Sequence, residues 1–235
     1  MQKPTDFYDY ISQRIATKSR PGGLNQYQLD VLRDPHPRKV VVWHRRAGKT
    51  LLSLVQLLKA TQERIGMYWH VYPYKEEARK SIWLNPDMLF KIIPEDWIKG
   101  FNSTLLTVTF KNGSVLSLEG ADDPKAMRGQ GPKGAVYDEF QNTKFEAWHT
   151  AAPIFRQNKG WVMFIGTPDG KNHFYDFYNR GLSPKRKEWR SWYMPASQSG
   201  ILTPDELQEE WDTRLTDEWY YQEFECAWTE GEGQV

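Results

Sequence analysis

Several short, mostly apolar runs, each followed by glycine, proline or polar residues, constrain the fold of this chain more than any other feature. An apolar run without alternation predicts a strand buried on both faces, which is typical of a parallel sheet. The segment from Thr50 to Ala60 follows the first run and has a broad apolar helical face. We therefore predict an α/β fold with a mainly parallel sheet flanked by helices, in which ligands bind beyond the carboxyl ends of the strands. The runs are Val40–Trp43, Met67–Val71, Ala135–Tyr137 and Val162–Ile165.

A different pattern surrounds Asn112-Gly113. Apolar and polar residues alternate over 106–110 and again over 116–119. An Asn-Gly pair between two alternating runs predicts a β-hairpin, which would be an insertion in the α/β fold. The segment from Lys75 to Trp83 has a helical pattern.

The chain changes character after Ser183-Pro184. Thr203 is predicted to cap a helix, with Pro204 at its first position and Glu206 completing a capping box. We therefore predict a core over residues 1–182 and a small helical subdomain over 183–235, whose last residues, 231–235, resemble the start of a linker.

Charge divides the chain in a similar place. The sequence holds 31 Lys and Arg against 30 Asp and Glu, but residues 1–202 carry a formal charge of +11 and residues 203–235 carry −10. A basic body with an acidic tail indicates an anionic polymer as a partner. The single cysteine, Cys226, excludes an internal disulfide and a cysteine-based zinc site and indicates a reducing compartment. No run approaches the ~20 apolar residues of a membrane span, so we expect no membrane association.

The first motif with chemical meaning is Gly48-Lys49-Thr50, between a predicted strand and a predicted helix. It matches the second half of a phosphate-binding loop, where backbone N–H groups at a helix N-terminus bind phosphate oxygens. Lys49 would reach the β- and γ-phosphates and the Thr50 hydroxyl would bind Mg²⁺. Trp43 replaces the first glycine of the usual motif. Three roles stay open for the preceding Arg45 and Arg46: contact with nucleotide, contact with DNA, or structural ion pairs.

Two further motifs end predicted strands. Asp138-Glu139 follows Ala135–Tyr137, and in such a pair Asp138 would hold Mg²⁺ while Glu139 would polarise the attacking water as a general base. Gly166-Thr167-Pro168 follows Val162–Ile165; Thr167 would sense the γ-phosphate, and the alternative is a simple turn.

Other motifs are excluded. Residues 129–134 match a dinucleotide-binding fingerprint but precede a strand and contain Pro132, so we interpret them as part of a loop that carries Arg128. The five histidines show no metal-binding spacing and are predicted to lie in the core or on the surface; they are His36, His44, His70, His149 and His173.

Together these motifs resemble the ATPase domain of the large terminase subunit of tailed bacteriophages, the motor that packages viral DNA into a capsid. In that family the first glycine of the phosphate-binding loop is often absent and arginines precede it. The segments that carry the resemblance are Leu24–Gln28 (the glutamine motif), Arg45–Thr50, Gly120–Pro124 with Met127–Gly129, Val136–Glu139, Gly166–Pro168, and Asp205–Trp228 (the lid).

The resemblance implies a P-loop NTPase of the ASCE type that uses ATP and Mg²⁺. It implies catalytic roles for Glu139 and Lys49, and for Arg128 as a finger that acts in trans on a neighbouring subunit's ATP. It implies metal binding by Thr50 and Asp138 and a coupling role for Thr167. The ATP-binding residues would be Gln28 (at the adenine), Arg45, Arg46, Ala47, Gly48, Lys49 and Thr50.

The expected function is therefore an ATP-hydrolysing motor that translocates double-stranded DNA into a procapsid, in the cytoplasm of the host cell and not as a virion component. Implied partners are double-stranded DNA, the portal protein and the small terminase subunit. The expected assembly is a homo-oligomeric ring, a pentamer by the resemblance, with a monomer possible in solution. Full-length relatives carry a nuclease domain after the lid; we recognise none here and expect no DNA cleavage by this chain.

Two other functions remain open: a helicase-type DNA-dependent ATPase, and a nucleotide-gated DNA-binding or scaffold module without turnover. A basic run after the core supplies candidates for DNA contact, although such a run is equally typical of a solvated face. Its members are Lys185, Arg186, Lys187 and Arg190.

Overall fold

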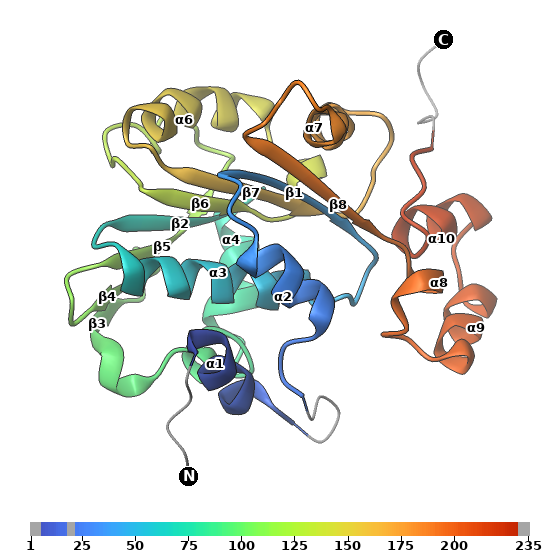
Figure 1. Ribbon diagram of the computed structural model, residues 1–235, viewed down its shortest axis with the longest axis horizontal. Coiled ribbons are helices and arrows are strands. Elements are labelled where there is room, and N and C mark those ends of the chain that lie inside the picture. The colour runs from blue at the N-terminus through green and yellow to red at the C-terminus, as the bar shows by residue number, and fades with distance from the viewer. Residues whose placement is uncertain (1–5, 18–21, 230–235) are drawn as a thin grey trace.

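An eight-stranded sheet forms the centre of the computed structural model, which describes residues 6–17 and 22–229 (Figure 1). The strand order is β3-β4-β5-β2-β6-β7-β1-β8, and all strands from β5 to β8 in that order run parallel. The predicted α/β fold with a mainly parallel sheet is confirmed. The parallel strands are β1 (Arg38–Trp43), β2 (Met67–Tyr72), β5 (Val115–Gly120), β6 (Gly134–Tyr137), β7 (Trp161–Gly166) and β8 (Trp189–Met194).

Helices cover both faces of the sheet, which explains why the central strands are apolar throughout. Val41 and Trp43 pack into a core on one face, whereas Val40 and Val42 pack into a second core on the other. The first core is covered by α1 (Phe7–Ile15), α2 (Gln26–Arg33), α3 (Lys49–Glu63) and α5 (Leu89–Ile92); the second by α6 (Phe145–Gln157) and α7 (His173–Leu182) (Figure 1).

The predicted hairpin is confirmed. It joins β4 (Thr107–Phe110) to β5 through Asn112-Gly113, and β3 (Ile98–Asn102) adds an antiparallel edge strand that the sequence did not reveal. Gly113 has φ +94°, a conformation that an L side chain rarely adopts. The predicted helix over 75–83 is also present, as α4 (Lys75–Ala78) followed by a π-helical turn, Arg79–Trp83.

Strand β8 corrects one part of the sequence analysis. We assigned residues after 182 to the helical subdomain, but Trp189–Met194 pairs in parallel with β1 and extends the core sheet. As an edge strand, β8 is partly exposed and includes Arg190 and Ser191, so it lacks the continuous apolar run of a central strand. The division into core and lid remains a proposal, with the helical unit beginning at α8 (Ala196–Ser199).

The helical unit lies beside the carboxyl ends of β1 and β8 (Figure 1). It continues with α9 (Pro204–Asp212) and α10 (Asp217–Glu223), and the predicted capping box between Thr203 and Glu206 is confirmed. A small apolar cluster that includes Leu202, Tyr220 and Phe224 holds it together. We refer to residues 196–228 as the lid. The expected linker, 231–235, lies outside the described residues. Within the described ranges, no helix has the length and apolar character that crossing a membrane requires.

Candidate nucleotide site

The loop between β1 and α3 has the backbone of a phosphate-binding loop. Gly48, the residue before α3, has φ +80°, and Arg46 has φ +66°. The left-handed conformation costs a non-glycine residue such as Arg46 on the order of 1–3 kcal/mol, so the surrounding contacts must hold it in place. The loop leads into a helix of 15 residues, whose N-terminus favours an anion, although the Arg45 and Ala47 N–H groups donate to the carbonyls of Glu223 and His44.

The Lys49 ammonium is folded back onto this loop. Its Nζ donates to the carbonyl oxygens of Trp43 and His44, both at 3.0 Å, and to Thr167 Oγ1 at 3.1 Å. The side chain is buried, and each of its three protons has an acceptor. A phosphate oxygen that binds Lys49 must therefore replace at least one of these acceptors, and Thr167 is the only side chain among those three.

Asp138 directly follows β6, at the carboxyl end of that strand. Its Oδ1 accepts from the Glu139 N–H at 3.0 Å, while its buried Oδ2 has no hydrogen-bond partner among the described residues. Burial and the neighbouring Glu139 charge raise the pKa of Asp138 to about 7, against the opposing effects of Lys49 and a hydrogen bond from Tyr72. A buried carboxylate oxygen without a donor is well suited to a cation or to water bound to one.

Magnesium fits this donor set. Mg²⁺ in phosphate-transfer sites uses one or two protein oxygens, with substrate phosphates and water completing its shell. The Asp138 carboxylate and the Thr50 hydroxyl supply such oxygens, and both act on the pKa of the neighbouring Tyr72 hydroxyl. The described residues contain no group of three or more His, Cys, Asp or Glu side chains that could hold a metal alone.

Glu139 faces the cleft from a strained backbone position. It has φ +49°, and its Oε2 accepts from Gln141 Nε2 at 2.6 Å. Gln141 packs so closely on β7 that a Cβ at Gly166 would lie 2.1 Å from Gln141 Oε1. Gln141 therefore positions Glu139, and Gly166 leaves room for Gln141. Sequence reasoning missed Gln141, although it lies two residues after Glu139 in the strand-end motif.

Gln28 holds the phosphate-binding loop from the outside. Its Nε2 donates to the Gly48 carbonyl at 3.1 Å, and its Oε1 accepts from the Asn25 N–H at 3.0 Å as part of a capping box. The side chain is buried, and these contacts occupy both ends of its amide. The expected contact between Gln28 and adenine stays a prediction.

Both loop arginines contact the lid. The Arg45 N–H donates to the Glu223 carbonyl at 2.8 Å, and its guanidinium lies 5.9 Å from the Trp219 ring centre. The Arg46 guanidinium is 2.9 Å from the Glu210 carboxylate. Of the three roles left open for these arginines, the structure contains the intramolecular contacts.

A buried histidine connects the loop helix to Asp138. His70 Nε2, on β2, is 2.6 Å from Ser53 Oγ and 3.7 Å from Asp138 Oδ2. Ser53 Oγ donates to the Thr50 carbonyl at 2.7 Å, so its single proton is used and His70 Nε2 is assigned as the N–H donor. Burial lowers the pKa of His70 to about 3, which keeps the ring neutral. His70 lies in the core, one of the two locations predicted for the histidines, and no sequence pattern indicates its two polar neighbours.

A cleft of about 940 Å³, a size suited to a nucleotide, lies at the carboxyl edge of the sheet; the predicted Gln28 and Asp138 are not among the described residues that line it. A second cavity of about 820 Å³ shares Thr50 and Glu139 with it. Arg128 is absent from the described walls of both cavities; it is exposed, on the loop between β5 and β6. The predicted residues that line the first cleft are Arg45, Arg46, Ala47, Gly48, Lys49, Thr50, Glu139 and Thr167.

Comparison with protein families gives one match over most of the chain. The family described as terminase large subunit, T4likevirus-type, N-terminal, matches residues 44–235. Among individual proteins, the terminase large subunits of Thermus phage G20c and Thermus virus P23-45 are 24% identical over 179 residues. That match covers 68% of this chain and 37% of each relative, so the chain spans well under half the length of these relatives.

Solved structures agree on the fold. The large terminase ATPase domain of Thermus phage P74-26 superimposes with a TM-score of 0.75 at 18% identity, covering 97% of this chain and 100% of that domain. The large terminase of the thermophilic bacteriophage D6E in complex with ADP gives 0.72 at 17% identity, covering 88% of this chain and 54% of that protein. The fold predicted from the strand-end motifs is thus that of terminase ATPase domains.

Proposed function

Because this chain belongs to the terminase large-subunit family and has the fold of its ATPase domain, we propose that it hydrolyses ATP to drive double-stranded DNA into a procapsid. The main supporting observation is that Lys49, Thr50 and Glu139 line one cleft at the carboxyl edge of the sheet, while the buried Asp138 lies next to Glu139 in the chain. This edge is where an α/β sheet binds its ligand.

The residues divide the chemistry among themselves. The N–H groups of the loop and Lys49 would bind the β- and γ-phosphates and stabilise charge on them during transfer. Asp138 and Thr50 would hold Mg²⁺, which supplies further neutralisation of the phosphate charge when bound. Glu139, held by Gln141, would accept a proton from the attacking water.

The contacts of the lid support a coupling between phosphate binding and movement of the lid. Lys49 contacts Thr167, and the two arginines beside Lys49 contact α9 and α10. Phosphate that draws Arg45, Arg46 or Lys49 toward itself would weaken their present contacts. The lid would respond by a change in position, which we propose as the origin of the stroke on DNA.

Assembly into a homo-oligomeric ring with a portal protein and a small terminase subunit belongs to the same proposal. Arg128 is exposed on a loop beside Gly129, which has φ +80°, and would reach the ATP of a neighbouring subunit. An arginine finger of this kind can raise the rate by ~10³–10⁵. To test it, Arg128→Ala and Lys49→Ala subunits are mixed at high concentration. Activity that neither variant has alone supports action in trans, and its absence argues against it.

The central test is ATPase activity of Glu139→Gln, measured as phosphate release with Mg²⁺ present. We expect a loss of roughly 10²–10⁴-fold with nucleotide binding retained, because only the general base is removed. Glu146→Gln, an exposed carboxylate on α6, is the matched control and should keep wild-type activity. Unimpaired turnover in Glu139→Gln would remove Glu139 from the role of base. ATP binding without hydrolysis by the wild type, even with DNA and portal, would favour the scaffold alternative, and unwinding of a forked duplex would favour the helicase alternative.

A further inference from the structure

The edge of the sheet opposite the nucleotide cleft is strongly basic. All six parallel strands begin at this edge, because their first residues are paired in register, as in Arg38 with Val162 and with Trp189. The segments that lead into these strands, and the helix ends beside them, carry the basic side chains. We call the following exposed or half-exposed residues the basic edge: Arg33, Lys59, Arg64, Lys111, Lys133, Arg156, Lys159, Lys185, Arg186, Lys187 and Arg190.

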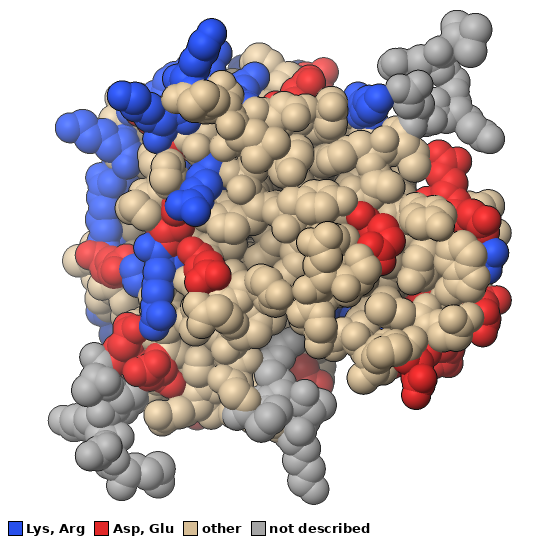
Figure 2. Space-filling view, turned by 45° about the vertical axis from the view of Figure 1, so that its right-hand side comes forward, with Lys and Arg blue, Asp and Glu red and all other residues tan. Residues whose placement is uncertain are grey.

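Basic residues recur at every strand start along this edge. Lys111, Arg64, Lys133, Lys159 and Lys187 each lie within four residues of the first residue of β5, β2, β6, β7 and β8, respectively. The remaining strand, β1, begins with Arg38-Lys39. Figure 2 shows most of the visible Lys and Arg side chains on the left-hand side of the molecule, with several Asp and Glu among them, whereas acidic side chains dominate the lid on the right. The charge asymmetry of the sequence is therefore also an asymmetry in space.

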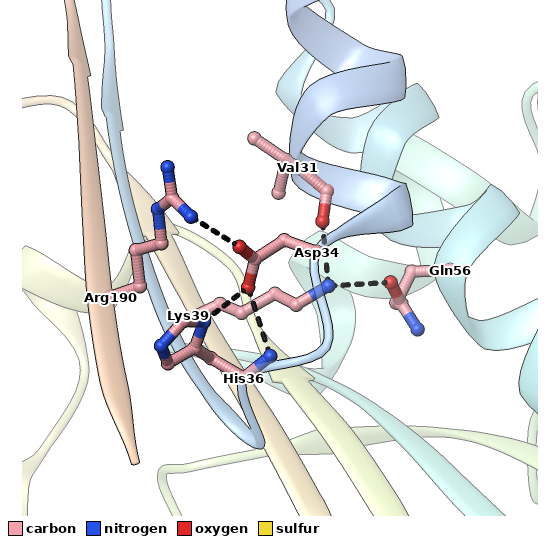
Figure 3. Close-up of polar contacts among 6 residues, drawn as sticks. All are labelled: Val31, Asp34, His36, Lys39, Gln56 and Arg190. Carbon is pink, nitrogen blue, oxygen red and sulfur yellow. Dashed lines mark hydrogen bonds and ion pairs between the residues drawn. The ribbon is translucent and has the colours of Figure 1, made fainter. Parts of the chain in front are cut away.

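The few acids near the basic edge are engaged by bases of their own. Asp34 accepts from Arg190 at 2.8 Å and from the His36 ring and N–H at 2.8 and 2.9 Å (Figure 3). Burial acts to raise the pKa of Asp34, but the hydrogen bonds from His36 and the Arg190 charge lower it, so the group stays ionised. Glu63 pairs with Lys59 at 2.7 Å. A third acid, Glu188, faces the positive charge of the buried Arg38.

The buried Lys39 adds nothing to the outer surface. Its Nζ donates to the Val31 carbonyl at 2.6 Å and lies 3.5 Å from Gln56 Oε1 (Figure 3). Burial lowers its pKa to about 8. Lys39 thus satisfies a carbonyl near the end of α2, and the positive potential of the edge comes from the exposed residues.

Most of those exposed bases lack an acidic partner. Helix C-termini favour a nearby cation, which accounts for Arg33 on α2 and Arg156 on α6. It does not account for the bases in the loops. Within residues 6–17 and 22–229, the structure contains no ion pair for Lys111, Lys133, Arg156, Lys159, Lys185, Arg186 or Lys187.

The spacing of the strands matches the geometry of a duplex. Adjacent strands lie about 4.8 Å apart, so six strands span roughly 24 Å. Duplex DNA carries one charge per about 1.7 Å of its axis, so a stretch of that length presents on the order of fourteen phosphates. We infer that the basic edge binds the phosphate backbone of duplex DNA, at the end of the sheet opposite the nucleotide cleft. The inference rests on the proposed function for the identity of the polymer.

The experiment compares two triple charge reversals in the full chain. One variant carries Lys185→Glu, Arg186→Glu and Lys187→Glu on the basic edge. The control carries Lys80→Glu, Lys125→Glu and Lys144→Glu, three exposed lysines outside the edge, and has the same net charge. Binding of a fluorescently labelled duplex is measured by anisotropy over a series of salt concentrations, with thermal melting and basal ATPase measured on each protein.

We expect the edge variant to bind duplex much more weakly than the control. The slope of log affinity against log salt should fall by about three, because each lost phosphate contact contributes about one. Basal ATPase and melting should match the control, since these side chains touch neither the cleft nor an acidic partner. Binding and salt slopes that are alike in the two variants would overturn the inference while leaving DNA as the partner.

Two further outcomes would also overturn the inference that the basic edge binds duplex DNA, and they distinguish why it fails. The acidic lid of a second copy is a competing occupant of the basic edge, so self-association is measured by sedimentation velocity. If the edge variant loses self-association and keeps duplex binding, the edge is a contact between subunits. If the wild type does not bind duplex even at low salt, DNA as a partner of this chain fails together with the inference, while the ATPase measurement still tests the catalytic proposal.

Discussion

The hydrogen bonds of Ser53 yield a quantitative prediction about how the nucleotide site is held together. Ser53 is fully buried on α3, donates to the Thr50 carbonyl and accepts from His70 Nε2. Ser53→Ala removes one hydroxyl and leaves the His70 N–H unpaired, because Asp138 Oδ2, at 3.7 Å, is beyond hydrogen-bond distance. Loss of the bond to Thr50 costs about 1 kcal/mol, and an unpaired buried donor costs a further 1–3 kcal/mol. We expect a loss of about 2–4 kcal/mol in the free energy of unfolding.

The same helix supplies a matched control. Thr61 is also fully buried and donates to the Leu58 carbonyl at 2.7 Å, but its Oγ1 accepts from the half-buried Gln62 at 3.1 Å and not from a buried histidine. Thr61→Val should therefore cost only about 1 kcal/mol. Urea unfolding followed by circular dichroism at pH 7.5 measures both variants. A Ser53→Ala protein that is no less stable than Thr61→Val would refute the assignment of His70 as a donor to Ser53.

A second readout separates positioning from packing. If Ser53 and His70 fix the distance between Thr50 and Asp138, Ser53→Ala should raise the Mg²⁺ concentration for half-maximal ATPase by roughly tenfold, as losses behind metal ligands do. Thr61→Val, at the far end of α3, should leave that concentration unchanged. An equal shift in both variants would show that loss of stability alone explains the effect.

Three further predictions follow from contacts around the cleft. Gly166→Ala should lower ATPase by about tenfold with the fold retained, because the new Cβ displaces Gln141 and so Glu139; full activity in a phosphate-release assay would contradict this. Burial lowers the pKa of His44 to about 4 in the folded chain, whereas the unfolded chain has a pKa of about 6.5. Between these two pH values His44 is protonated in the unfolded chain and neutral in the folded chain, which favours unfolding. Stability should therefore fall by about 3 kcal/mol as the pH drops from 6.5 to 4, and urea titrations should show a smaller fall in His44→Gln. Glu210→Gln frees the exposed Arg46 at a cost below about 1 kcal/mol in stability and should tighten ATP binding a few-fold by calorimetry; unchanged or weaker binding would place Arg46 outside nucleotide contact.

Structural elements could be predicted from the sequence where a particular residue type is needed for a particular local conformation or burial. Continuous apolar runs identified the central strands, Asn112-Gly113 identified the hairpin, and Thr203 with Glu206 identified a helix start. The strand-end motifs predicted a candidate site at one edge of the sheet because the carboxyl ends of parallel strands lie together.

The remaining features depend on tertiary neighbours that no local pattern reveals. Strand β8 escaped notice because an edge strand exposes one face and alternates weakly. The contact of Gln28 with the Gly48 carbonyl joins residues twenty apart in the chain, and that of His70 with Ser53 crosses from a strand to a helix. The gathering of bases at strand starts is spread over more than 120 residues of sequence, so it becomes visible only when the strands are in register.

The three hydrogen bonds of Lys49 make the site selective for the number of charges that a ligand brings. An anion that approaches this ammonium group meets protons that already have acceptors, so binding is an exchange of partners rather than a simple attraction. A lone phosphate offers few replacements and gains little from the exchange. A polyphosphate also contacts the loop N–H groups and a metal ion on Asp138. These added contacts offset the free-energy cost of replacing the acceptors of Lys49. Spent inorganic phosphate should therefore be a poor competitor for the cleft, which favours its departure after each cycle.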